Sequence, residues 1–174
     1  IIYSLITGTG QITLNQDVAS AELIVNAGDK VVRQTRHLPY QSGKAFKATM
    51  TAVPFVGAVN NNATFEVGLF DDEADKDMGT YPNQYQYGNG LFFRYNSGWS
   101  FINRSSVTGS QVDTTYLQAD WNVDKLDGTG NSGVNLSATS LNIFWIEFGW
   151  LSTLGFRFGI IHEGKKIVAH EQWE

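Results

Sequence analysis

Short segments in which apolar and polar residues alternate recur along this chain, and they constrain its fold more than any other feature. The clearest runs from Leu154 to Glu163, and its apolar positions include Phe156, Phe158 and Ile160. A period of two residues indicates a β-strand with one buried face. Turn-forming residues separate such segments at intervals of about ten residues. No long segment has the helical period of 3.6 residues, so the sequence predicts an all-β fold.

The predicted strands share a high content of β-branched and aromatic residues between Gly, Asn, Asp and Ser. They are Ile12–Leu14, Ala21–Val25, Lys30–Leu38, Ala45–Val56, Thr64–Phe70, Leu91–Tyr95, Trp99–Arg104, Gln111–Leu117, Leu141–Leu151, Leu154–Glu163 and Lys166–Gln172. About ten strands without crossover helices predict an antiparallel sandwich or barrel.

The segment Leu141–Leu151 is apolar on both faces, which predicts a central strand covered on both sides. A short loop joins it to the next predicted strand. If the aromatic residues of the two strands share one face, Glu147 lies opposite Arg157. The sequence therefore predicts a structural ion pair between these two side chains, worth less than about 1 kcal/mol if exposed.

Length and composition limit the class of protein. The 174 residues fit one domain, and the segment 1–27 is either an edge strand or a linker to a preceding region. The chain opens at Ile1 rather than Met, which suggests processing or excision from a longer protein. It has no cysteine, so disulfides and thiolate sites are excluded. The net charge of −5 argues against nucleic-acid binding, and no apolar run is long enough to cross a membrane.

Glu147 is the most tempting catalytic candidate, because it lies among tryptophan and phenylalanine residues. Glycoside hydrolases use two carboxylates about 5–10 Å apart. In glucanases with a concanavalin-like sandwich, both lie on one strand at short alternating spacing. Here Trp145 lies two positions before Glu147, Ile143 lies four positions before it, and Gly149 lies two positions after it. No partner acid is present in this pattern, so we expect no enzymatic activity.

An acidic cluster spans 71–77 and suggests a weak calcium site. Its candidate ligands are Asp71, Asp72, Asp75 and Asp77. Calcium takes six to eight oxygen ligands, and clustered carboxylates supply several. The spacing does not match an EF-hand, because Gly and Glu are absent from the required positions. A solvated loop therefore remains the alternative, and we expect no other cofactor.

An uncharged aromatic and amide segment follows the acidic cluster. Its candidate contact residues are Tyr81, Asn83, Gln84, Tyr85, Tyr87 and Asn89. Aromatic rings stack on sugar faces and amides bond hydroxyl groups, so a glycan site is chemically reasonable. Contact with a neighbouring subunit uses the same residue types. Both interpretations remain open from the residues alone.

Two further groups of residues bear on partners and metals. Basic residues, which could meet an acidic partner or form a solvated face, gather at Arg33, Arg36, His37, Lys44 and Lys47. Among the histidines, His162 falls on the aromatic face of its strand, which predicts a hydrogen-bonded and partly buried side chain.

From about Arg33 to Glu171 the chain resembles a β-sandwich domain of structural proteins from tailed phages and large DNA viruses. The most telling run is Gln118–Gly133, which reads QADWNVDKLDGTGNSG. Other motifs in the same order are residues 65–71, FEVGLFD; 89–93, NGLFF; 142–151, NIFWIEFGWL; and 157–159, RFG. The stretch 71–87 is an extra segment relative to that pattern, and we expect it to carry contacts of this protein's own.

The resemblance implies a jelly-roll or concanavalin-like β-sandwich located in the virion, where it builds a capsid, tail or fibre. Its partners would be other copies of itself and other virion proteins. A receptor- or glycan-binding module of a viral fibre or spike is the alternative, with the segment 81–87 as the site. In either case, the resemblance implies that the Gly-rich loop 127–133 is a close-approach turn rather than a phosphate site.

Overall fold

The computed structural model describes residues 4–6, 8–33, 44–70, 88–149 and 155–173. The fold is all-β, and the helical structure in these ranges is limited to one 3₁₀ turn, η1 (Gln118–Asp120). The chain divides into two compact units. The first, the N-terminal unit, contains Ile1–Tyr40 and Thr80–Pro82; the second, the sandwich unit, contains Gln41–Gly79 and Asn83–Glu174.

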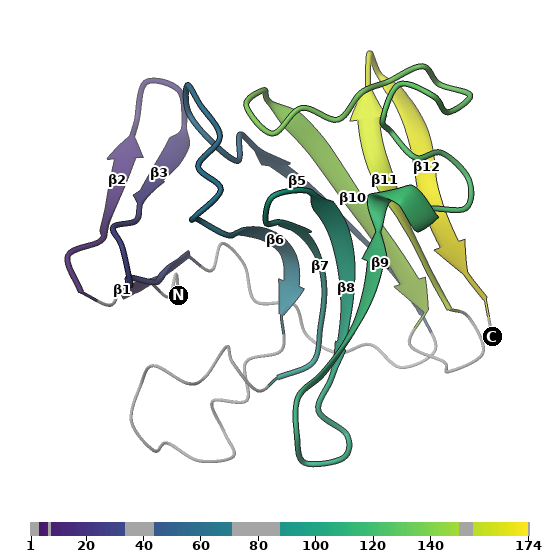
Figure 1. The fold of residues 1–174 in the computed structure, drawn as a ribbon, viewed down its shortest axis with the longest axis horizontal. Coiled ribbons are helices and arrows are strands. Elements are labelled where there is room, and N and C mark those ends of the chain that lie inside the picture. The colour runs from purple at the N-terminus through teal and green to yellow at the C-terminus, as the bar shows by residue number, and fades with distance from the viewer. Residues whose placement is uncertain (1–3, 7, 34–43, 71–87, 150–154, 174) are drawn as a thin grey trace. The chain divides into compact units, whose positions relative to one another are not determined.

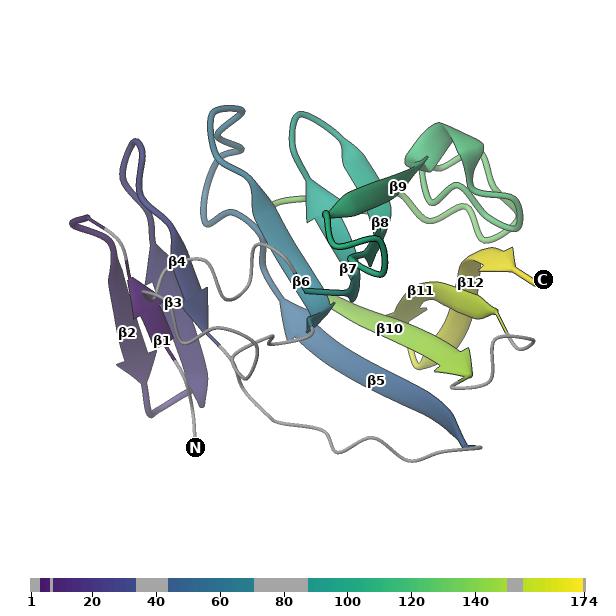
Figure 2. The ribbon, with the colours of Figure 1, turned by 90° about the horizontal axis from the view of Figure 1, so that it is seen from below.

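The sandwich unit contains two four-stranded antiparallel sheets (Figures 1 and 2). The first sheet has the strand order β12-β11-β10-β5 and the second has the order β6-β7-β8-β9. Their strands are β5 (Ala45–Ala52), β6 (Phe65–Phe70), β7 (Gly90–Tyr95), β8 (Trp99–Ser105), β9 (Val112–Leu117), β10 (Asn142–Gly149), β11 (Phe156–His162) and β12 (Lys165–Gln172). We call these two sheets the β10 sheet and the β7 sheet.

The alternating pattern of the sequence produces the hydrophobic core between these two sheets. Phe93 of β7 is fully buried, and its ring contacts Phe101 in the same sheet and Phe144 and Phe158 in the other. The core therefore consists of the inward faces of both sheets, the arrangement of a β-sandwich.

The segment after β9 joins an edge of each sheet. The indole N–H of Trp121 donates to Tyr116 O on β9, while the backbone N–H groups of Val123 and Asp124 donate to Ala169 O on β12. Edge strands otherwise expose unpaired backbone groups. This segment, which we call the brace (118–126), thus satisfies part of both edges on one side of the sandwich (Figure 1).

The N-terminal unit contains two antiparallel strand pairs. β1 (Ser4–Ile6) pairs with β4 (Val31–Arg33), and β2 (Gln11–Asn15) pairs with β3 (Ser20–Ile24). Ile12 lies opposite Leu23 and Leu14 lies opposite Ala21, so one face of the β2–β3 hairpin is apolar.

The described residues form twelve strands, where the sequence predicted about ten. β1 was missed because three residues are too few to show an alternating pattern. Only residues 31–33 of the predicted strand Lys30–Leu38 form a strand, β4, and residues 34–38 lie outside the described ranges. The other predicted segments correspond to observed strands, and β10 lies between β11 and β5 as expected for a central strand. The all-β class is confirmed, whereas the finer topology stays a prediction.

Candidate functional site

The predicted calcium ligands and most of the predicted contact residues lie outside the described residues. These are Asp71, Asp72, Asp75, Asp77, Tyr81, Asn83, Gln84, Tyr85 and Tyr87. Asn89 is described, and its side-chain oxygen accepts a hydrogen bond from the backbone N–H of Ser106 at 2.9 Å. This contact ties the start of β7 to the turn after β8. Asn89 therefore has a structural role, whatever else it contacts.

Glu147 lies on the outer face of the β10 sheet, where its carboxylate is held by two cations. Arg157 lies opposite it in the register, as the sequence predicted, and Nη2 of Arg157 is 2.9 Å from Oε1. Nζ of Lys166 is 2.8 Å from Oε2. Each carboxylate oxygen thus has its own cationic partner, and the sequence reasoning had identified only the first.

These two contacts determine the charge state of Glu147. The hydrogen bond from Arg157, followed by that from Lys166, lowers the pKa of Glu147 below its ordinary value. The general acid of a glycoside hydrolase needs a raised pKa. In the retaining enzymes a second carboxylate, the nucleophile, lies about 5–5.5 Å from it. Here the neighbouring strand on one side offers Arg157 and the other offers Lys47. The geometry therefore favours a structural ion pair over a catalytic carboxylate.

Trp145 lies beside Glu147 on the same outer face and is fully buried. Its indole N–H donates to the carbonyl oxygens of Ile160 and Ile167, each at 3.1 Å. Nζ of Lys166 lies 3.7 Å from the ring centroid, so the same ammonium group covers the ring and binds Glu147.

Gly159 allows the close strand approach beneath this ring. It lies opposite Trp145, and a Cβ there would overlap the carbonyl oxygen of Ile167. The register between β11 and β12 shifts at this point, as in a β-bulge. Because the Ile167 carbonyl accepts the indole N–H, the polar group of Trp145 is satisfied although this tryptophan is buried on an outward-facing strand position.

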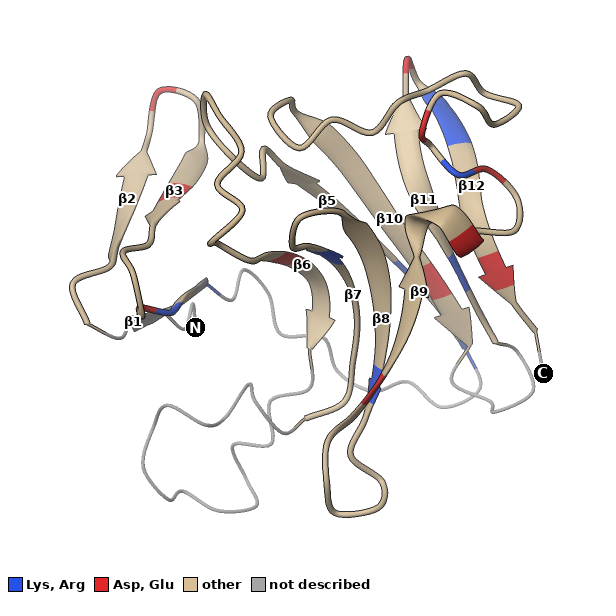
Figure 3. Ribbon diagram, viewed as in Figure 1, with Lys and Arg blue, Asp and Glu red and all other residues tan. Residues whose placement is uncertain are grey.

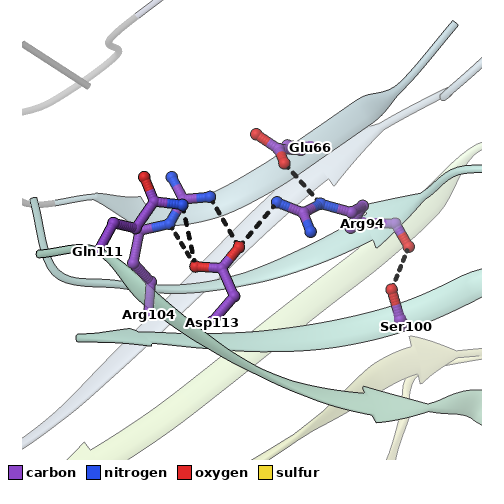
Figure 4. Close-up of polar contacts among 6 residues, drawn as sticks. All are labelled: Glu66, Arg94, Ser100, Arg104, Gln111 and Asp113. Carbon is purple, nitrogen blue, oxygen red and sulfur yellow. Dashed lines mark hydrogen bonds and ion pairs between the residues drawn. The ribbon is translucent and has the colours of Figure 1, made fainter. Parts of the chain in front are cut away.

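The outer face of the β7 sheet holds a second charged group, drawn in Figure 4. Asp113 of β9 lies at its centre and accepts hydrogen bonds from Nε and Nη2 of Arg104, at 2.7 and 3.0 Å. Nη2 of Arg94 reaches the same carboxylate at 3.3 Å, and Nε of Arg94 lies 2.7 Å from Glu66. The Gln111 amide donates to Asp113 as well, at 3.3 Å. We call these residues the Asp113 network.

The Asp113 network is partly buried and covers an aromatic ring. The guanidinium carbons of Arg104 and Arg94 lie 4.9 and 5.4 Å from the centroid of Phe92, which is fully buried. The hydrogen bond from Arg104 lowers the pKa of Asp113, and the hydrogen bond to Asp113 raises the pKa of Arg104. All four charged groups are paired with one another, two positive and two negative.

The motif run that carries the sequence resemblance forms the brace and the loop after it. The buried carboxylate of Asp124 accepts hydrogen bonds from the backbone N–H groups of Leu126 and Ser132, at 2.9 and 2.8 Å. A Cβ at Gly130 would overlap this carboxylate, so glycine is needed there. The close-approach turn that the resemblance implied is therefore present, and its polar side chains bond within the loop itself.

His170 connects the brace to β12. Its Nδ1 accepts the backbone N–H of Asn122 at 3.2 Å, and its ring stacks on Phe158. Burial lowers the pKa of His170. The prediction that His162 is partly buried was wrong, because His162 lies at the exposed end of β11, beyond the last core position, Ile160.

Three of the predicted basic residues are described: Lys44 and Lys47 are exposed, and Arg33, at the end of β4, is half-buried. Arg36 and His37 lie outside the described ranges. Within the described ranges, no group of three or more His, Asp or Glu side chains is placed to hold a metal ion, and no helix there could cross a membrane. The predicted calcium ligands lie outside these ranges, so the calcium site stays a prediction.

No protein-family model, curated protein or solved structure matches this chain.

Proposed function

We propose that this chain is a non-catalytic structural domain of a virus particle, a jelly-roll or concanavalin-like sandwich that packs against other protein chains. The observation that carries the proposal is the use of the polar motif residues. Asn122, Asp124 and Gly130 bear the sequence resemblance to virion proteins, and each serves the brace or its loop. The residues of this motif have contacts that stabilise the fold, which supports a structural role for the domain.

The state of Glu147 supports the absence of catalysis. Its two oxygens are occupied by Arg157 and Lys166, and its pKa is lowered by them. A general acid would need the opposite shift. The proposal therefore assigns Glu147 and Arg157 to holding strands β10 and β11 in register.

A receptor- or glycan-binding module is the second candidate function. The segment between the end of β6 and the start of β7 includes three tyrosines and several amide side chains, a composition suited to stacking on sugar rings. Under this alternative the same scaffold presents that segment to a host glycan.

The main proposal is tested by mass spectrometry of density-purified particles of a virus whose genome encodes this sequence. Peptides of the chain should be present in a fixed ratio to the major particle proteins, with cross-links from the segment 71–87 to other chains. Absence of the chain from such particles contradicts the proposal. Selective binding of the recombinant chain to an oligosaccharide array, lost in Tyr85→Ala, would favour the second candidate instead.

A further inference from the structure

Four charged residues of alternating sign lie in one row across the outer face of the β10 sheet. Lys47 lies opposite Glu147, Glu147 lies opposite Arg157, and Arg157 lies opposite Glu171. The row crosses all four strands, and Figure 3 shows the blue and red positions alternating along it. Directly paired residues of neighbouring strands share a face, so all four side chains belong to one surface.

The two ends of this row differ from its middle. Glu147 and Arg157 bind each other, whereas Lys47 and Glu171 form no ion pair with any other described residue. Lys47 is exposed and Glu171 is half-buried. Neighbouring strands lie about 4.8 Å apart, so the Cα atoms of these two residues are roughly 14 Å apart, too far to pair with each other. The row therefore ends in one free positive and one free negative charge.

We propose that two copies of this chain pack through the outer face of the β10 sheet, about a two-fold axis that runs nearly parallel to the strands. Such an axis reverses the order of the row in the second copy. Lys47 then faces the partner's Glu171, and Glu171 faces the partner's Lys47. Glu147 and Arg157 face the partner's Arg157 and the partner's Glu147. A self-complementary patch of this kind is what a two-fold interface requires.

The alternation of charge also selects the direction of the axis. A two-fold axis along the row would place each residue over its own copy, lysine on lysine and glutamate on glutamate. Like charges in contact are unfavourable and exclude that arrangement. Only the axis parallel to the strands brings every charge of the row against an opposite charge.

The rest of the face fits a weak interface. Ile143 lies opposite Ile161, and both are half-buried, so reversal of the strand order brings isoleucine against isoleucine. The face spans roughly 14 Å across the strands and roughly 20 Å along them, about 280 Å² on each copy, which is well below the roughly 800 Å² per partner of a standard protein interface. We expect an association that is sensitive to salt and that many copies in an assembly would reinforce. The inference thus rests on the proposed packing role and names its partner, a second copy.

Charge reversal at the two ends of the row, followed by sedimentation velocity at low and high salt, tests this arrangement. Lys47→Glu places two glutamates against each other, and Glu171→Lys places two lysines against each other. Each variant alone should raise the dissociation constant of the dimer at least about tenfold. An equimolar mixture of the two variants restores both opposite-charge contacts, so its affinity should return to within about threefold of the original.

Lys125→Glu and Asp17→Lys are the matched controls, because they change the net charge equally at exposed positions outside the β10 sheet. They should leave self-association unchanged. Unfolding curves of every variant check that the fold is kept, which we expect because neither charged end group forms an ion pair with another described residue, and the bonds of Glu171 to Asn122 use its backbone.

Three results would overturn the inference: a monomeric chain at millimolar concentration, single variants that associate like the original, or a mixture as weak as its components. Its failure is distinct from failure of the proposed function. If the chain is found in virus particles but the mixture does not recover, the virion role stands and this interface is wrong. If the mixture recovers but particles lack the chain, the reverse holds.

Discussion

The outer faces of the two sheets carry similar numbers of charges in different arrangements. On the β7 sheet, Asp113 binds two arginines, and the second arginine also binds Glu66, so no charge of the Asp113 network is left over. On the β10 sheet, the row that crosses the strands pairs only at its middle and ends in Lys47 and Glu171.

This difference separates charges that stabilise the chain from charges that are available to a partner. The Asp113 network covers the buried ring of Phe92, so its ion pairs belong to the folded structure of one copy. The ends of the row on the β10 sheet have no such role. Substitutions in the Asp113 network should therefore lower the free energy of unfolding, whereas substitutions at the ends of the row should change self-association. Unfolding and sedimentation measurements distinguish the two effects.

The largest effect is expected from breaking the Asp113 network. Asp113→Ala leaves Arg104, whose guanidinium is mostly buried, without its bidentate partner. Unpaired buried donors are costly, so the free energy of unfolding should fall by about 2–3 kcal/mol in urea titrations. Asp17→Ala, at an exposed turn, is the control and should change it by less than about 0.5 kcal/mol. A loss equal to that of the control would show that the network does not stabilise the sheet.

A smaller effect is expected from the tryptophan beneath the charged row. Trp145→Phe keeps a buried ring but removes the N–H that binds Ile160 O and Ile167 O. We expect a loss of about 1–2 kcal/mol in the free energy of unfolding, because two carbonyl groups lose a donor. Trp173→Phe, at an exposed position, serves as the control. An unchanged midpoint for Trp145→Phe would mean that water replaces the indole N–H.

The titration of His170, which lies on neither outer face, gives a further test of which charges affect stability. Burial lowers the pKa of His170 below its ordinary value of 6.5. Below about pH 6.5 the unfolded chain binds a proton that the folded chain does not. The free energy of unfolding should therefore decrease as the pH is lowered from about 6.5 until the pKa of the folded state is reached. Above pH 6.5 both states are neutral and the histidine contributes no pH dependence.

His170→Gln should flatten this part of the stability profile, whereas His162→Gln, at an exposed site, should leave it unchanged. Urea midpoints measured between pH 7.5 and 5 distinguish the two variants. A profile that stays equally steep in His170→Gln would place the titrating group elsewhere. Glu147 and Asp113, whose pKa values are lowered, lose their contribution only at more acidic pH.

The smallest effect on stability is expected at the free ends of the row. Lys47→Ala should change the free energy of unfolding by less than about 0.5 kcal/mol, because Lys47 forms no ion pair with another described residue. The same variant should weaken self-association in sedimentation experiments. A loss of stability without a change in association would reverse the roles assigned to the two faces.

Much of the sandwich could be predicted from the sequence because alternation is a local signal. The period of two over Leu154–Glu163 identified both the strand and its core face, and the assumption of shared aromatic faces was enough to pair Glu147 with Arg157. The close-approach turn in the loop 127–133 came instead from the sequence resemblance, which named neither Gly130 nor its partner Asp124. Local patterns therefore predict strands well.

The missed contacts depend on pairing between distant strands. Asp113 on β9 contacts Arg94 on β7 across the intervening strand β8. This strand order depends on pairing in the sheet, and the sequence near Asp113 does not indicate it. Lys166 reaches Glu147 across the indole of Trp145, over a register shift that a simple alternating pattern does not predict. Had the strand order been known, the alternation of charge over Lys47, Glu147 and Arg157 would have been the signal for the row.

Disulfide trapping tests the central claim most directly, because the native chain has no cysteine and gives no background. Lys47→Cys and Glu171→Cys are mixed, oxidised mildly and analysed without reductant. The proposed two-fold arrangement places these two positions opposite each other, so the mixture should form a covalent heterodimer much faster than either variant forms a homodimer. A mixture that forms no more dimer than Lys125→Cys with Glu171→Cys would contradict the account.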